Sequence, residues 1–104
     1  MTKYRNKKTN GYDSKKEAKR AEELKLLERV GSITDLQEQV SIILQERFKH
    51  NGKWERAITY IADFVYMQDG VKIVEDVKGF KTDVYKIKRK MLLFTYPDIK
   101  FIET

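Results

Sequence analysis

Two short turn signals constrain the fold of this chain more than any other feature of its sequence. Asn51-Gly52 and Asp69-Gly70 each lie between two apolar segments. Such pairs favour two-residue hairpin loops, because both of their residues tolerate positive φ. A two-residue loop also determines which residues of its flanking strands face each other. The sequence therefore predicts two successive antiparallel hairpins whose register can be calculated.

Alternating apolar residues place the strands of these hairpins over 39–48, 55–67 and 71–78. A later helix is expected over 82–95, and a short strand over 99–102.

An earlier helix is predicted over 15–30, because Ser14 and Glu17 match a capping box and Gly31 is a typical C-terminal cap. Its apolar stripe is Ala18, Ala21, Leu24 and Leu27. The element order is thus α-β-β-β-α-β. We expect one α/β domain over 11–104 with a mixed sheet flanked by helices, preceded by a flexible basic arm over 1–10.

Composition excludes several classes of site. The 104 residues include no cysteine and one histidine, so disulfides, thiolate metal sites and His-rich zinc sites are ruled out. No apolar run approaches the roughly 20 residues that span a bilayer, and the charged N-terminus lacks the apolar segment of a signal peptide. A soluble, cytoplasmic protein with no membrane partner is expected.

The net charge of +6 is unevenly distributed along the chain. Residues 1–20 carry eight Lys/Arg against two acids, residues 21–80 carry eight against eleven, and residues 81–104 carry six against three. Basic ends around an acidic centre fit a polyanionic partner. Ordinary solvated lysines are an equally good explanation of the charge alone.

The second turn places two acids together. With Asp69-Gly70 as the loop, Asp63 lies directly opposite Asp76, and Lys78 projects from the same face, while Glu75 points the other way. Like charges at this distance destabilise a sheet unless a positive group lies between them.

The first turn predicts what surrounds these acids. With Asn51-Gly52 as the loop, Val40 faces Asp63 and Ile42 faces Ile61. The face that carries the acids is then apolar, and we expect the helix over 15–30 to cover it. Glu17 lies within the apolar stripe of that helix, so its carboxylate is expected to point at the same place.

Three converging carboxylates form an oxygen-ligand site for a hard divalent cation, with Mg²⁺ expected and Mn²⁺ able to substitute. Such a site with an adjacent lysine suits phosphodiester hydrolysis. Each residue also has a plainer interpretation. Glu17 is equally well explained as a helix cap, and Asp63 and Asp76 as a solvated pair neutralised by Lys78.

Asp63, the short hairpin and Asp76-Val77-Lys78 together resemble the PD-(D/E)XK nuclease superfamily, whose restriction-endonuclease-like core has the order α-β-β-β-α-β. The chain is most similar to a family of small phage proteins assigned to it, through "SKKEAKRAEELKLLE", "ITDLQEQV", "YIADFVY" and "VEDVKG". The superfamily includes archaeal-type Holliday junction resolvases, which are dimers.

The resemblance implies that Asp63, Asp76 and the Val77 carbonyl bind the metal and that Lys78 assists the attacking water. It also implies that Glu17 supplies the helix-borne acid, although Glu22 and Glu28 are alternatives. Gln39 resembles a glutamine often found near such sites.

Basic residues that could contact DNA phosphates surround these motifs. A helix cap at Thr82 could hold a phosphate beside the metal. The remaining candidates are Lys7, Lys8, Lys81, Lys86, Arg89 and Lys90.

The second face of the sheet is predicted to be too apolar to remain exposed to solvent, and we expect a homodimer interface there. It consists of Ile58, Tyr60, Phe64, Tyr66, Ile73 and Val77. His50 is expected to be an exposed loop residue, and Trp54 to pack on the sheet rather than to stack on bases.

The expected function is magnesium-dependent endonucleolytic cleavage of branched or structured DNA, with Holliday junction resolution in a phage as the favoured role. The alternative is a non-catalytic DNA-binding accessory module that retains the fold. An RNA-directed nuclease is a third interpretation.

Overall fold

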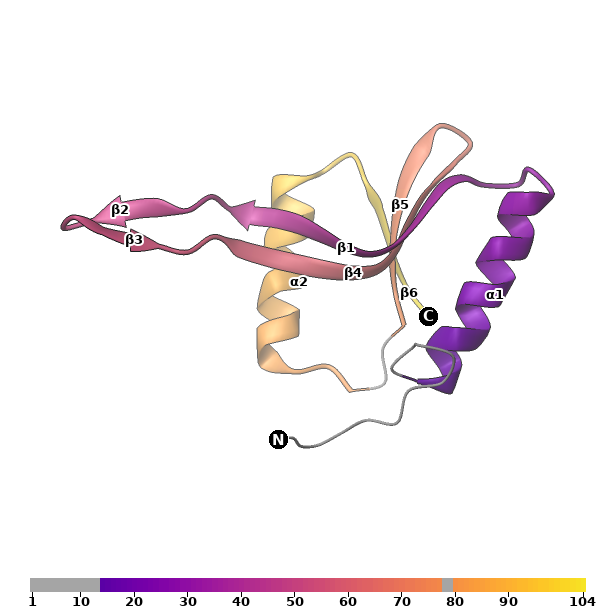
Figure 1. The fold of residues 1–104 in the computed structure, drawn as a ribbon, viewed down its shortest axis with the longest axis horizontal. Coiled ribbons are helices and arrows are strands. Elements are labelled where there is room, and N and C mark those ends of the chain that lie inside the picture. Colours follow the sequence, from indigo (N-terminus) through magenta and orange to yellow (C-terminus); the bar gives the residue numbers. More distant parts are fainter. Residues whose placement is uncertain (1–13, 78–79) are drawn as a thin grey trace.

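The structure, a computed structural model, describes residues 14–77 and 80–104. Over these residues the chain forms two helices, a four-stranded sheet and a two-stranded ribbon (Figure 1). The elements are α1 (Lys15–Arg29), β1 (Thr34–Gln45), β2 (Phe48–His50), β3 (Lys53–Glu55), β4 (Ile58–Gln68), β5 (Val71–Asp76), α2 (Asp83–Thr95) and β6 (Lys100–Glu103). The predicted arm over 1–10 lies outside the described residues.

Both ends of α1 follow from its sequence. The Ser14 side chain accepts a hydrogen bond from the Glu17 amide at 3.0 Å, which satisfies one free N–H of the first turn. At the other end Gly31 has φ +84°, and the Ser32 amide donates to the Leu27 carbonyl at 2.9 Å. A left-handed residue followed by this bond ends a helix. The predicted helix is confirmed.

The main sheet has the strand order β1-β4-β5-β6. β4 pairs antiparallel with both β1 and β5, whereas β5 and β6 are parallel. The connection between the parallel strands contains α2, as a parallel pair requires. The predicted α/β class with a mixed sheet and two helices is therefore confirmed.

Both predicted turns are confirmed. Asn51 and Gly52 have φ of +50° and +76°, and Asp69 and Gly70 have φ of +52° and +78°. Two consecutive positive φ values characterise the type I′ turn. His50 faces Lys53 across the first turn, and Gln68 faces Val71 across the second.

The predicted register of the first hairpin is wrong beyond its turn. Val40 pairs with Ala62 and Ile42 with Tyr60, because the pairing shifts by one residue between Ile43 and Gln45. A shift of one residue turns every later side chain to the other face of the sheet.

The strand boundaries in the two hairpins also differ from the predicted ones. β1 begins at Thr34 rather than at residue 39, and the long hairpin is interrupted between β1 and β2 and between β3 and β4. β5 ends at Asp76, two residues before the predicted end.

Helices α1 and α2 cover opposite faces of the sheet. One core cluster contains Ala21 and Leu24 of α1, with Phe64, Tyr66 and Ile73 of the sheet. The other contains Leu92 of α2 with residues of β1, β4 and β5, namely Leu44, Tyr60, Ala62, Val65 and Val74. The prediction that α1 covers the face of Val40 and Ile42 is therefore wrong, since both residues belong to the α2 side.

The residues on which the sequence places a dimer interface do not share one face, since Tyr60 packs on the α2 side and Phe64, Tyr66 and Ile73 pack on the α1 side, and both sides are covered within the chain. Tyr60, Phe64, Tyr66 and Ile73 are at most 3% exposed. The reason given for a homodimer is therefore wrong, and the homodimer itself stays a prediction. Over the described residues, neither helix is long and apolar enough to cross a membrane.

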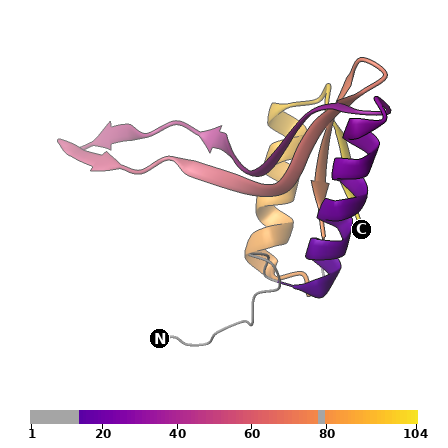
Figure 2. The same cartoon turned by 45° about the vertical axis from the view of Figure 1, so that its right-hand side comes forward.

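Trp54 does not pack on the sheet. It lies in the β2–β3 ribbon, which projects beyond both helices (Figures 1 and 2), and it is 54% exposed. His50 is exposed beside the turn, as predicted.

A buried ion pair attaches α1 to the sheet. The Arg20 guanidinium donates from Nε and Nη2 to both carboxylate oxygens of Glu75, at 2.5 and 3.1 Å. Tyr66 and Thr104 hydroxyls donate to the same carboxylate at 2.7 and 3.0 Å. Glu75 is 0% exposed, so its charge depends on these partners. Burial and the Glu75 hydrogen bond raise the pKa of Tyr66 to about 12.

We predict that Arg20→Ala lowers the free energy of unfolding by about 3 kcal/mol, because it leaves the buried Glu75 charge without its guanidinium. Urea denaturation measures this change. The matched control is Lys19→Ala at the exposed neighbouring position, with an expected change within about 0.5 kcal/mol. Equal losses for the two variants would contradict the importance of the ion pair.

Candidate functional site

Two carboxylates meet where β4 and β5 stop pairing. Beyond the last regular pair, Phe64 with Glu75, the Asp63 amide donates to Asp76 Oδ1 at 3.2 Å. The Val77 amide donates in return to Asp63 Oδ2 at 2.8 Å. The two acids therefore lie side by side, as the second turn predicts. Each one accepts a backbone hydrogen bond from the strand opposite.

Asp76 is held on its other side by β6. It pairs with Glu103 in the parallel register, and its carbonyl accepts a hydrogen bond from the Thr104 amide at 2.9 Å. Its side chain is 0% exposed. A buried carboxylate next to a second acid needs compensating donors or a cation.

Gln39 connects this pair to a third acid. Its Nε2 donates to Glu17 Oε2 at 2.9 Å and to Asp63 Oδ1 at 3.3 Å. The amide of Gln39 thus lies between a carboxylate of α1 and a carboxylate of β4. Glu17 is 5% exposed, so it faces the sheet and not the solvent, as its place in the apolar stripe predicts.

The backbone at Gln39 explains how one glutamine reaches both acids. Its φ is +53°, a left-handed conformation that costs a non-glycine residue about 1–3 kcal/mol. Leu36 before it packs on the α1 side and Val40 after it packs on the α2 side. In a regular strand these two residues would share a face.

The side chains of β4 also switch from one face of the sheet to the other, at the residue opposite Gln39. Ala62 packs on the α2 side and Phe64 on the α1 side. The pairs Glu38–Phe64 and Val40–Ala62 place Gln39 across from Asp63. Asp63 therefore lies where the sheet passes from one helix layer to the other, and this position lets a helix-borne acid and a strand-borne acid approach each other.

The oxygen atoms of Glu17, Asp63 and Asp76 could hold a divalent cation. All three are hard ligands of the kind that Mg²⁺ and Mn²⁺ prefer. Over the described residues, no three Asp, Glu or His side chains are close enough to form a metal cluster as they stand. The Gln39 amide lies between Glu17 and Asp63, where a cation could replace its two hydrogen bonds.

A basic pocket of about 340 Å³ lies on the α2 side of Asp76. It is lined by Lys81, Tyr85, Lys86, Arg89, Lys90 and Glu103. Figure 2 shows that both helices begin at the end of the molecule where β5 ends. Their positive dipole ends add to the attraction of this end for anions.

Two side chains of this pocket, Tyr85 and Lys81, are held by hydrogen bonds to Glu103. The Tyr85 hydroxyl donates to Glu103, and Lys81 Nζ donates to Glu103 at 3.1 Å. Burial and the hydrogen bond to Glu103 raise the pKa of Tyr85. The same hydrogen bond lowers the pKa of Glu103. Thr82 is occupied as the cap of α2, because its Oγ1 accepts from the Tyr85 amide at 3.0 Å.

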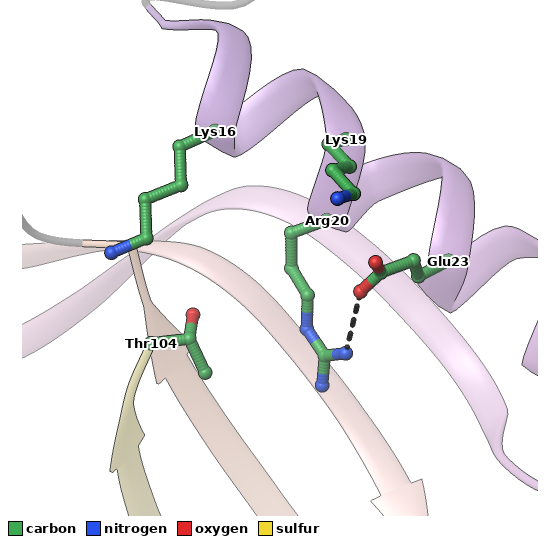
Figure 3. Close-up of a pocket in the computed structure, with 5 residues that line it drawn as sticks. All are labelled: Lys16, Lys19, Arg20, Glu23 and Thr104. Carbon is green, nitrogen blue, oxygen red and sulfur yellow. Dashed lines mark hydrogen bonds and ion pairs between the residues drawn. The ribbon is translucent and has the colours of Figure 1, made fainter.

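A second pocket of about 340 Å³ lies on the α1 side (Figure 3). It is lined by Lys16, Lys19, Arg20, Glu23 and Thr104. Arg20 donates to Glu23 at 3.1 Å as well as to Glu75, so its charge is already neutralised. Lys16 and Lys19 are exposed and give this pocket its positive character.

The structure brings together four of the predicted site residues: Glu17, Gln39, Asp63 and Asp76. It also gathers Lys81, Lys86, Arg89 and Lys90 around one pocket. Val77 takes part through its amide. Lys7, Lys8 and Lys78 lie outside the described residues. The roles of all these residues stay predictions.

Sequence reasoning missed Arg20, Tyr85 and Glu103. The partner of Arg20 could not be found from the α1 sequence, because it depends on which sheet face α1 covers. Glu103 was recognisable only as the residue after the predicted strand over 99–102, whereas the structure includes it in β6.

We predict that Asp76→Asn raises the free energy of unfolding in chelator by up to about 1 kcal/mol. The asparagine keeps an oxygen that accepts from the Asp63 amide and removes one of two adjacent like charges. Urea denaturation with and without chelator tests this.

The matched control is Glu75→Gln, one residue earlier on the opposite face. It is expected to lower the free energy of unfolding by about 3 kcal/mol, because the Glu75 charge is compensated by Arg20. Similar losses for both variants would mean that Asp76 is an ordinary structural carboxylate.

Comparison with known proteins gives one match. No curated protein and no solved structure matches the chain significantly. The profile of the family described as "Protein of unknown function (DUF1064)" matches residues 1–103. Because that match covers nearly the whole sequence, this chain belongs to the DUF1064 family.

Proposed function

We propose that this protein is a metal-dependent endodeoxyribonuclease of the PD-(D/E)XK type that cleaves branched or structured DNA. The observation that carries the proposal is the approach of Asp63 in the middle of β4 and Asp76 at the end of β5, with Glu17 joined to Asp63 through Gln39. Two acids from adjacent strands and one from a helix are linked where β5 ends. Packing alone does not require this arrangement, because like charges repel.

The element order supports a restriction-endonuclease-like core. In that reading α1 supplies the helix-borne acid, the β4–β5 hairpin supplies the two strand-borne acids, and α2 lies on the opposite face. Residues 76–78 read Asp-Val-Lys, which is the final part of the superfamily motif.

Each residue has a chemical role in the proposal. Asp63 and Asp76 hold the cation with Glu17, and Val77 contributes its carbonyl. Gln39 orients Glu17 and Asp63. Lys78 orients the attacking water and stabilises charge on the phosphate. Mg²⁺ at such a site would polarise a phosphate and help to deprotonate a bound water.

The basic pocket supplies a path for the DNA backbone. Lys81, Lys86, Arg89 and Lys90 line it, beside the strand end that carries Asp76. Contacts of this kind bind phosphate without reading sequence, so the proposal includes selection by DNA shape. In the proposal Lys7 and Lys8 also contact DNA phosphates, and two copies acting together as a dimer would match the two strands of a junction.

We predict that Asp76→Ala and Lys78→Ala each lower the cleavage rate of a four-way junction about 100-fold or more with Mg²⁺, because each removes a group that acts on the reacting phosphate. DNA binding in chelator is expected to remain. Cleavage is followed on gels and binding by fluorescence anisotropy. The control is Lys72→Ala, an exposed lysine of the same strand, with unchanged cleavage.

A panel of linear, nicked, single-stranded, flapped and four-way-junction DNAs, with a structured RNA, identifies the substrate. Wild-type cleavage rates for Asp76→Ala or Lys78→Ala would show that the chemistry is wrongly assigned. Binding without cleavage of any substrate, with either Mg²⁺ or Mn²⁺, would identify an accessory module. Preferential cleavage of RNA would identify an RNA-directed nuclease.

A further inference from the structure

Residues 45–56, which include the β2–β3 ribbon, form an exposed arm that contributes nothing to the core. Every residue of this segment is exposed, and neither core cluster includes one of them. The arm continues the β1–β4 pair past the edge of both helices (Figure 1). A two-stranded ribbon without a packed face has little stability of its own, so its composition is not explained by the needs of folding.

One face of the arm combines an aromatic ring with two cations. Lys49 lies opposite Trp54 in the register, and Arg47 is two residues before Lys49, so the three share a face. Arg47 Cζ is 4.2 Å and Lys49 Nζ is 5.2 Å from the centroid of the Trp54 ring. Phe48 and Glu55 form a pair that faces the other way.

The charge of the arm is positive. The arm contains more cationic side chains than acidic ones: Arg47, Lys49, Lys53 and Arg56 are positive, and Glu46 and Glu55 are negative. Positive side chains that flank an exposed ring are the arrangement with which proteins bind unstacked bases. The ring or guanidinium stacks on a base and the cations neutralise adjacent phosphates. A protein partner would be favoured by an apolar face with few charges, which this arm does not have.

We propose that the Arg47–Lys49–Trp54 face of the arm binds the branch point of a structured DNA, with Trp54 stacked on a base that the branch leaves unstacked. This inference rests on the proposed function for its choice of DNA as the ligand. A continuous duplex exposes no base face along its length, so this contact gives the protein its preference for branched DNA.

The arm also sets a distance to the acids. Trp54 and Asp63 are nine residues apart on nearly continuous strands, which corresponds to at most about 30 Å. The arm therefore contacts a part of the DNA that is separate from the phosphate beside Asp63 and Asp76.

The test uses the full chain in chelator, so that it does not depend on cleavage. Trp54 is the only tryptophan of the sequence, so the intrinsic tryptophan fluorescence of the protein reports on the arm alone. We expect quenching that saturates with a four-way junction, and weaker quenching with a linear duplex of equal length. Labelled DNA and anisotropy measure binding independently.

Substitutions then separate stacking from charge. Trp54→Ala is expected to weaken junction binding about tenfold and linear-duplex binding little, and Trp54→Phe to restore part of the loss. The double variant Arg47→Gln and Lys49→Gln is expected to weaken binding to both DNAs and to lower the slope of log K against log salt by about two. Phe48→Ala, on the opposite face, is the matched control and should bind like wild type.

Three results would overturn the inference. The first is unchanged tryptophan fluorescence while anisotropy shows saturated binding. The second is wild-type junction preference in Trp54→Ala. The third is a change in tryptophan fluorescence with protein concentration in the absence of DNA, together with dimers in sedimentation. That result would make the arm an interface between two copies of the chain. If DNA quenches Trp54 fluorescence but the protein cleaves no DNA, the inference about the arm stands and the proposed nuclease activity is wrong.

Discussion

The antiparallel pairing of β4 with β5 is the constraint on which the candidate site depends. The Asp69-Gly70 turn, with positive φ at both residues, leaves this pair no freedom of register. Asp63 and Asp76 are consequently adjacent, and each accepts a hydrogen bond from the other strand's backbone. β6 then holds Asp76 from its far side. Because backbone hydrogen bonds hold both acids in place, the two side chains are poorly able to move apart. The repulsion between their carboxylates therefore has to be offset by other groups.

The two acids at the end of β5 show how neighbouring residues can serve different purposes. Glu75 faces α1, where Arg20, Tyr66 and Thr104 satisfy its carboxylate. Asp76 faces the other way, beside Asp63 and the basic pocket of α2. Alternation along the strand turns these two carboxylates to opposite faces of the sheet, so that Glu75 reaches Arg20 and Asp76 reaches Asp63. The left-handed backbone at Gln39 adds the connection to Glu17, at a cost in strain that is common at functional sites.

Much of the fold was predictable because its signals are local. Ser14 and Gly31 specify the ends of α1 through hydrogen bonds within a few residues. The two turns specify hairpins through the φ values that their own residues tolerate. The meeting of Asp63 and Asp76 followed from counting back along one turn. The partner of Val40 could not be obtained in that way. Val40 pairs with Ala62 and not with Asp63, because a one-residue irregularity between Ile43 and Gln45 changes the partner of every residue farther from the turn.

The sequence by itself determined the ends of α1, both hairpin turns and the adjacency of Asp63 and Asp76. Only the tertiary structure decided that α1 packs on Phe64 and Tyr66, that Glu75 is neutralised by Arg20, and that Trp54 lies on an exposed arm. The physical reason is the range of the interactions concerned. Caps and turns depend on backbone angles of adjacent residues, whereas the face that a helix covers depends on the register of distant strands, which a single extra residue inverts.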